Sequence, residues 1–244
     1  MDVFSMTHRG IIRSENQDHI FLSGEETPYY AIVADGMGGH VGGQVASAKA
    51  VSHVCQELQG KDISYLNEEK LKALVEEAGQ EVWHMAERSE ALKDMGTTLT
   101  MVVVQDGSLL ISHVGDTRAY LLRDGVLTQL TKDHSYVQYL VDKGLLTQEE
   151  AARHPYRNMI MRALGMEEVE ADAFTVPFAK GDNLLLCSDG LSGYVTDEEI
   201  EKILLDKKTA QEKTEALVDL ALDRGGRDNI SVIVAVNDGG KAHG

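Results

Sequence analysis

The sequence has few cysteines, few prolines and few basic residues, and these shortages narrow the class of protein. Its two cysteines, Cys55 and Cys187, cannot build a disulfide framework, and neither has a partner at zinc-ligand spacing. No apolar run is long enough to span a membrane, and the N-terminus lacks the basic and apolar regions of a signal peptide. We therefore expect a cytoplasmic protein with no membrane insertion.

The charge balance is strongly acidic. The chain carries 23 Lys and Arg against 40 Asp and Glu, which gives a formal net charge of −17. Nucleic acids and anionic membrane surfaces both require clustered Lys and Arg, so neither is an expected partner. The excess acid is either solvated helix surface or partly neutralised by bound cations, and composition does not separate these two interpretations.

Only three prolines occur, and no low-complexity stretch, linker or internal repeat divides the 244 residues. We therefore expect a single domain over residues 1–244, with a polar C-terminal tail at about 237–244. Because no exposed apolar stripe demands a partner, a monomer is expected.

Apolar spacing predicts the secondary structure. A strand over Tyr29–Ala34 leads through a glycine-rich loop into two helices, and residues 97–131 are expected to form a four-stranded meander with Asp-Gly hairpin turns. A mostly helical insert at about 133–164 follows, and then strands near 174–176, 184–187 and 230–236 alternate with helices over 197–205 and 209–224. Antiparallel hairpins with separate helix pairs favour an α+β fold over a doubly wound parallel sheet.

Four Asp residues stand at the ends of predicted core strands. Asp35 and Asp189 each follow an apolar strand and precede a glycine, Asp116 follows Gly115 after a third strand, and Asp228 precedes the last strand. A rigid scaffold can aim carboxylates placed in this way at one point. For any single site the alternative is a plain Asp-Gly turn, but four such sites together indicate a shared centre.

Converging carboxylates would repel one another unless a cation neutralised them. Ligands that are all oxygen favour the hard ions Mg²⁺ and Mn²⁺ over zinc, and both ions accept carboxylate and water. Two such ions can bind a phosphate, lower the pKa of a bridging water and stabilise the departing oxygen. The four Asp residues therefore predict a metal centre suited to phosphate chemistry.

Six short motifs occur in a fixed order between Thr7 and about Val236. They are Arg13-Ser14-Glu15-Asn16-Gln17-Asp18, Asp35-Gly36-Met37-Gly38-Gly39-His40, Gly96-Thr97-Thr98, Gly115-Asp116-Thr117-Arg118, Ser188-Asp189-Gly190 and Asp228-Asn229. In this order they resemble the metal-dependent protein phosphatase family, protein phosphatase 2C, in its compact bacterial form. The resemblance implies a four-layer αββα sandwich: two mostly antiparallel sheets flanked by helix pairs, with a helical flap insert at about 133–164.

The resemblance also implies roles for the site residues. Asp35 would bridge two central Mn²⁺ or Mg²⁺ ions, with the carbonyl of Gly36 on one of them, while Asp189 and Asp228 would bind the other. Asp116 with Asp189 would hold a third, weaker ion. Asp18 would orient metal-bound water, and Arg13 would clamp the phosphate with paired hydrogen bonds. The alternative for Arg13 is a surface salt bridge.

Two positions depart from the family pattern. Gln17 stands where many relatives have Glu, so we expect somewhat weaker metal binding. Met37 stands where eukaryotic relatives carry a His proposed as general acid, and His40 is the nearest titratable substitute. The alternative for His40 is a loop residue that hydrogen-bonds to backbone.

The resemblance implies a bacterial protein serine/threonine phosphatase that hydrolyses phosphoserine and phosphothreonine by direct attack of a metal-bridging hydroxide. Phosphorylated proteins would be its substrates, and a cognate serine/threonine kinase would be the opposing enzyme. Two alternatives keep the same fold: a phosphatase for a small phosphomonoester, and a regulatory binding module with a weak site. The presence of all four Asp residues and Arg13 speaks against the weak module.

Overall fold

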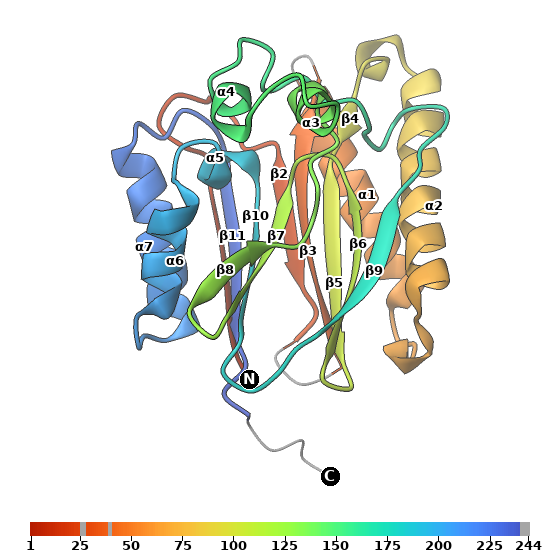
Figure 1. Ribbon diagram of the computed structural model, residues 1–244. Coiled ribbons are helices and arrows are strands. Elements are labelled where there is room, and N and C mark those ends of the chain that lie inside the picture. Colours follow the sequence, from red (N-terminus) through yellow and green to blue (C-terminus); the bar gives the residue numbers. More distant parts are fainter. Residues whose placement is uncertain (25–27, 39–40, 240–244) are drawn as a thin grey trace.

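The computed structural model describes residues 1–24, 28–38 and 41–239, and its strands form two sheets (Figure 1). We call them sheet A and sheet B, and every strand pair in both is antiparallel. Sheet A has the order β1-β11-β10-β7-β8, and sheet B has the order β2-β3-β5-β6-β9, with β4 paired to β3. The strands of sheet A are β1 Asp2–His8, β7 Arg118–Arg123, β8 Val126–Gln129, β10 Asn183–Cys187 and β11 Ile230–Val236. Those of sheet B are β2 Asp18–Leu22, β3 Tyr29–Met37, β4 Gly96–Thr97, β5 Leu99–Gln105, β6 Ser108–Val114 and β9 Asp172–Pro177.

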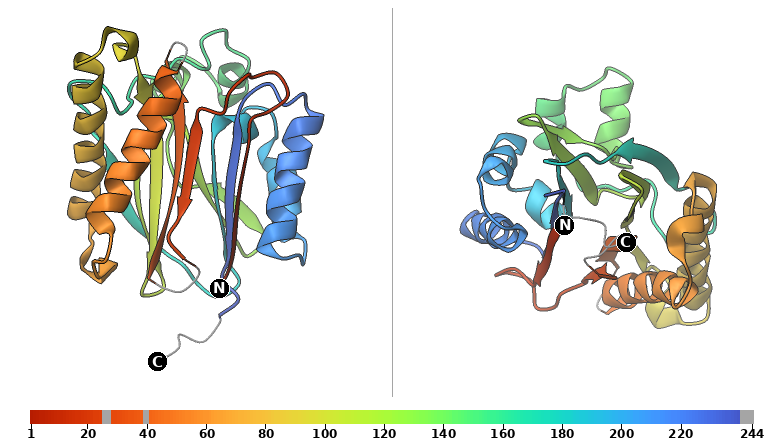
Figure 2. Two further views of the ribbon diagram at one scale, coloured as in Figure 1. Left: turned by 180° about the vertical axis from the view of Figure 1, so that it is seen from behind. Right: turned by 90° about the horizontal axis from the view of Figure 1, so that it is seen from below.

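A pair of helices covers the outer face of each sheet (Figure 2). Helices α1 Gly42–Leu58 and α2 Glu68–Glu87 pack on sheet B, whereas α6 Asp197–Leu205 and α7 Ala210–Asp223 pack on sheet A. The shorter helices are α3 Tyr136–Asp142, α4 Gln148–Ala152, α5 Asp189–Ser192, and the 3₁₀ turns η1 Ile63–Tyr65 and η2 Glu90–Leu92. The four-layer αββα arrangement is confirmed. No helix in the described ranges is long and apolar enough to cross a membrane.

The core strands are apolar on both faces because each has a layer on either side. In β3, Ile32 and Ala34 pack toward α1 and α2, whereas Ala31 and Val33 pack between the two sheets. Burial of a large apolar side chain stabilises the fold by about 1.5–3 kcal/mol. The double burial explains why this strand appears in the sequence as an unbroken apolar run rather than an alternating one.

The predicted four-stranded meander is wrong. Both Asp-Gly hairpins form, with positive φ at Asp106 and Asp124, but β5–β6 belongs to sheet B and β7–β8 to sheet A. The chain crosses between the sheets through residues 115–117. Local turn signals identify each hairpin, but they carry no information about which sheet the next strand joins.

The predicted insert is less helical than expected. Within residues 133–164, α3 has seven residues and α4 has five, and most of the rest is turn or irregular chain. Both helices begin at a side-chain cap, with Ser135 accepting from the N–H of Gln138 and Thr147 from that of Glu150. Caps and short apolar stretches start these helices, but neither helix has a long apolar face to extend it.

Candidate active site

The Asp residues singled out in the sequence meet at one edge of the sandwich. Asp18 and Asp35 lie opposite each other at the ends of β2 and β3. Asp189 follows the end of β10, and Asp228 precedes the start of its antiparallel neighbour β11. Asp116 lies in the crossover between the two sheets. This edge carries α3, α4 and α5 and is the end of the molecule away from both termini (Figure 1).

Backbone contacts hold Asp35 at this edge. Its N–H donates to Thr98 Oγ1 over 3.0 Å, and its carbonyl oxygen accepts from Thr97 Oγ1 and from the Thr98 N–H, each over 2.9 Å. The next residue must be glycine, because a Cβ on Gly36 would lie 2.1 Å from the carbonyl oxygen of Gly43. The Asp35 carboxylate is therefore aimed by a rigid strand end.

Several carboxylate oxygens at the edge are buried without a protein partner. Asp18 is 4% exposed, and its Oδ2 accepts from Ser188 Oγ over 2.8 Å. Its Oδ1, together with Oδ1 of Asp116 and of Asp189, has no hydrogen-bond partner among the described residues. Because leaving a buried acceptor unsatisfied is costly, these atoms suit a cation or a water shell around one.

Burial and mutual repulsion raise the pKa values of this cluster. Burial, opposed in part by hydrogen bonds from Ser231 and Ser188, raises the pKa of Asp18 to about 7. Burial and the charge of Asp228 raise the pKa of Asp189 to about 6. The pKa values of Asp35 and Asp116 lie well above their usual range, first because of burial and then because of neighbouring carboxylates. Without a cation, these four carboxyl groups therefore lose their protons at higher pH than an ordinary Asp.

The donor set fits hard cations with water in their coordination shells. Across the described part of the chain, no three His, Cys, Asp or Glu side chains converge tightly enough to enclose a metal ion. Asp35 and Asp189 nevertheless lie close enough for the charge of Asp189 to raise the pKa of Asp35. Mg²⁺ keeps several waters and needs only one or two carboxylates, so an open carboxylate edge suits it better than it suits zinc.

Arg13 lies at the mouth of the cluster. Its Nη2 is 2.8 Å from Asp228 Oδ2, and its side chain is 51% exposed. This contact is the salt bridge that was the alternative interpretation of Arg13, and it also places a free face of the guanidinium beside the carboxylates. An exposed ion pair of this kind contributes at most about 1 kcal/mol, so the arginine can exchange partners.

Asn229 is a structural anchor that the sequence did not reveal. Its Nδ2 donates to the carbonyl oxygens of Arg9 and Glu15 over 2.8 and 2.9 Å, and its Oδ1 accepts from the N–H of Gln17 over 2.8 Å. The loop that carries Arg13 is thereby fixed to the start of β11. In the sequence, Asn229 appears only as part of the Asp228-Asn229 motif, without a role, because its three backbone partners lie more than two hundred residues away.

A cleft of about 580 Å³ opens beside Asp116 and Asp189. The segment 133–164 forms one wall through α3, α4 and Arg157, and residues 192–197 form the other. Arg118 and Asp133 pair on its floor over 2.7 Å. Arg157 stacks over the ring of Tyr194, 5.8 Å from the centroid. Charged and polar side chains, among them Arg118, Asp133 and Arg157, therefore line the cleft next to Asp116 and Asp189.

His40, the candidate general acid, lies outside the described residues, as does Gly39. The described chain before it ends at Gly38, whose φ is +137°, and resumes at Val41. Strand β3 ends at Met37, two residues beyond Asp35, and the position of the imidazole stays a prediction.

The fold and this edge define an αββα protein with an acidic centre between its sheets. A sequence model described as protein phosphatase 2C matches residues 12–231. The chain belongs to the protein phosphatase 2C family.

Relatives match over nearly the full length. The serine/threonine phosphatase stp of Listeria monocytogenes is 41% identical over 239 residues, which cover 95% of this chain and 94% of the relative. The structure of the S. agalactiae serine/threonine phosphatase matches with a TM-score of 0.89 at 36% identity, covering 96% of this chain and 99% of that one. The catalytic domain of the phosphatase PstP in complex with two manganese ions matches with a TM-score of 0.86 at 39% identity, covering 95% and 96%.

Proposed function

We propose that the chain is a metal-dependent protein phosphatase that hydrolyses phosphoserine and phosphothreonine. The observation that carries the proposal is the set of buried, unpartnered oxygens of Asp18, Asp116 and Asp189 in the described chain, beside Asp35. Family membership and the manganese ions in the related PstP structure support the same function.

In this proposal, Asp35 with the carbonyl of Gly36, Asp189 and Asp228 would hold two central Mn²⁺ or Mg²⁺ ions, and Asp116 with Asp189 would hold a third. Bound ions lower the pKa of the attacking water and neutralise charge on the phosphate. Asp18, held by Ser188, would accept a hydrogen bond from that water and orient it. Arg13 releases Asp228 and donates paired hydrogen bonds to two phosphate oxygens.

His40 is the proposed general acid that protonates the departing serine or threonine oxygen. Strand β3, which carries Asp35, ends at Met37, three positions before His40, and an imidazole titrates in the range that this step requires. The pH–rate profile of His40→Gln tests the assignment. If the variant loses the fall in rate at alkaline pH, the assignment is supported. If the profile is unchanged, His40 is a loop residue without a catalytic role.

We also propose that residues 133–164 act as a flap over the cleft and that the chain forms one domain, residues 1–244. The flap lines one wall of the cleft, so residues flanking the phosphorylated side chain can lie between α3–α4 and residues 192–197. The open cleft favours a protein substrate over a small phosphomonoester. We also propose that a cognate serine/threonine kinase is the opposing enzyme, that the protein is cytoplasmic and that it is a monomer.

The test is hydrolysis of a phosphothreonine peptide with and without Mn²⁺, in the wild type and in Asp35→Asn. Asp106→Asn is the matched control, because Asp106 forms a hairpin turn far from the carboxylate edge. Activity that needs Mn²⁺ and is lost only in Asp35→Asn is expected. Inactivity of the wild type with metal would sink the proposal, and much faster turnover of a small phosphorylated metabolite would favour that substrate class.

A further inference from the structure

His134 lies where the segment 133–164 meets the crossover that carries Asp116. Its backbone N–H donates to the carbonyl oxygen of Gly115 over 2.7 Å, and its Nδ1 accepts from the Gly115 N–H over 3.2 Å. One residue thus bonds both the N–H and the C=O of the residue before Asp116. The His134 side chain is only 7% exposed, so water competes weakly for these contacts.

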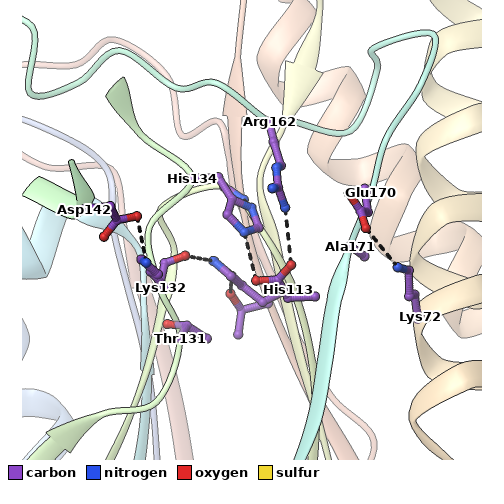
Figure 3. A network of polar contacts seen from close by, with 12 residues as sticks. Lys72, His113, Thr131, Lys132, His134, Asp142, Arg162, Glu170 and Ala171 are labelled. Atoms are coloured by element: carbon purple, nitrogen blue, oxygen red, sulfur yellow. Dashed lines mark hydrogen bonds and ion pairs between the residues drawn. The ribbon is translucent and has the colours of Figure 1, made fainter. Parts of the chain in front are cut away.

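These contacts define the protonation of the ring. Because the Gly115 N–H is a donor, Nδ1 must be the unprotonated nitrogen, and Nε2 carries the proton. Nε2 then donates to Asp172 Oδ2 in β9 over 3.2 Å, and Asp172 Oδ1 accepts from Arg162 over 3.3 Å (Figure 3). The His134 carbonyl oxygen accepts from the N–H of Met161 over 2.7 Å. His134 therefore connects both ends of the segment to sheet B.

A second histidine, His113, packs beside His134 and is linked through Thr100 to Thr117, the residue after Asp116. His113 is fully buried, and its ring centroid lies 4.8 Å from that of His134. Its Nε2 donates to the carbonyl oxygen of Lys132 over 3.1 Å, and its Nδ1 lies 2.9 Å from Thr100 Oγ1. Thr117 Oγ1 lies 2.8 Å from that same hydroxyl oxygen.

The residues on both sides of Asp116 are therefore fixed within one buried network, while Asp116 Oδ1 itself has no partner in the described ranges. The contacts of Gly115 and Thr117 therefore help to set the direction in which this carboxylate points.

We infer that neutral His134 is a positioning residue that orients the Asp116 carboxylate toward the cleft and couples that orientation to the segment 133–164. The inference rests on the proposed metal role of Asp116. It assigns His134 no contact with substrate or metal. Its effect passes through the Gly115 peptide group.

Two substitutions separate the two ring contacts. An Asn side chain can keep an acceptor near the position of Nδ1, whereas a Gln side chain can keep a donor near Nε2. We expect His134→Gln to weaken Mn²⁺ binding at the Asp116 site on the order of tenfold, as is usual when a residue that orients a metal ligand is lost. His134→Asn should bind Mn²⁺ as the wild type does. Calorimetric titration of the full chain measures binding directly, and thermal melting in EDTA shows whether either variant is merely destabilised.

Asp116→Asn, alone and combined with His134→Gln, shows whether the metal role of Asp116 or only the role of His134 is wrong. If Asp116→Asn leaves the Mn²⁺ isotherm unchanged, the proposed metal role of Asp116 is wrong and the inference fails with it. If Asp116→Asn changes the isotherm and His134→Gln does not, the inference alone is overturned. In the Asp116→Asn background, His134→Gln should cause no further loss, and additive losses would also overturn it.

A measurement on the unmodified chain keeps the inference testable should the Gln variant not fold. The ¹⁵N spectrum of the His134 ring at neutral pH should show a neutral imidazole protonated at Nε2. A ring protonated at Nδ1, or at both nitrogens, overturns the inference because neither form can accept from the Gly115 N–H.

Discussion

At the scale of single residues, the site consists of carboxylates that the protein does not neutralise by itself. Arg13 is the one cation in direct contact with a proposed metal ligand in the described chain, and it pairs only with Asp228. Asp18 and Asp189 have raised pKa values because burial and like charge both disfavour ionisation. Such a cluster costs folding free energy near neutral pH until a cation binds.

Asp18→Asn should stabilise the metal-free protein at alkaline pH while reducing activity. The folded pKa of Asp18, about 7, lies above its unfolded value of 3.8. Its contribution to stability is therefore fully present below pH 3.8 and is lost as the pH rises through 7. Each unit of pKa difference corresponds to about 1.4 kcal/mol, so the ionised group costs several kcal/mol in the wild type. An amide avoids this cost but orients water poorly.

Thermal melting in EDTA between pH 4 and pH 8 measures this effect. The unfolding free energy of the wild type should fall more steeply with rising pH than that of Asp18→Asn. Parallel curves for the two proteins would contradict the assigned pKa.

His113 should give the opposite dependence on pH. Burial and the neighbouring His134 lower its pKa from 6.5 to about 4. Between these values the unfolded chain binds a proton that the folded chain does not, so stability is fully present above pH 6.5 and falls toward pH 4, by about 3 kcal/mol. His113→Asn removes this titration. Its unfolding free energy should fall less between pH 7 and pH 4.5 than that of the wild type, whatever the absolute cost of the substitution. Equal losses would show that His113 titrates normally.

At the scale of elements, the link between β6 and β7 decides where Asp116 stands. Gly115 has a φ of +106°, and a Cβ there would lie 2.4 Å from Thr98 Cγ2. Only glycine therefore allows the chain to turn from sheet B to sheet A within three residues. The same turn exposes the Gly115 peptide groups to His134.

Gly115→Ala should destabilise the protein by about 3 kcal/mol or more, since it combines a left-handed backbone with overpacking against Thr98. Gly107→Ala is the matched control. Gly107 also has positive φ, at +69°, but a Cβ there meets nothing within 4 Å. The control should therefore cost only about 1–2 kcal/mol. Urea denaturation measures both, and equal losses would mean that the close approach to Thr98 is relieved by small shifts.

At the scale of the whole molecule, two hairpin-built sheets bring five carboxylates from distant parts of the chain to one edge. Asp18 and Asp35 come from sheet B, Asp189 and Asp228 flank strands of sheet A, and Asp116 joins the sheets. A cation at this edge would bind the folded chain and not the unfolded one, so binding and folding are linked.

Mn²⁺ should therefore raise the melting temperature of the wild type, and more at pH 8 than at pH 5, because protons compete for the same carboxylates. At a concentration one hundred times the Kd, the gain is about 2.7 kcal/mol. Asp35→Asn should lose most of this gain and Asp106→Asn should keep it. If Mn²⁺ does not change the melting temperature of the wild type, the proposed metal centre is contradicted.

Much of the fold was predictable because its signals are local. The apolar run before Asp35, the Asp-Gly turns at residues 106–107 and 124–125, and the capping box of Thr196 and Glu199 each occupy a few adjacent residues. Strand, turn and cap preferences act over that distance, so the sequence predicted these elements and their approximate bounds. The ordered motifs likewise determined the family, and with it the αββα layers.

Only the tertiary structure decided which sheet each strand joins and which distant residues contact each other. It placed β6 and β7 in different sheets, and it bonded Asn229 to a loop more than two hundred positions away. It also packed the rings of His113 and His134 against each other and bonded His134 to Gly115, the residue before Asp116. These contacts join residues far apart in the chain, and their energy depends on burial and hydrogen-bond geometry that no local pattern encodes. The sequence by itself determined which carboxylates could bind a metal ion. The packing of the two sheets decided which contacts orient those carboxylates.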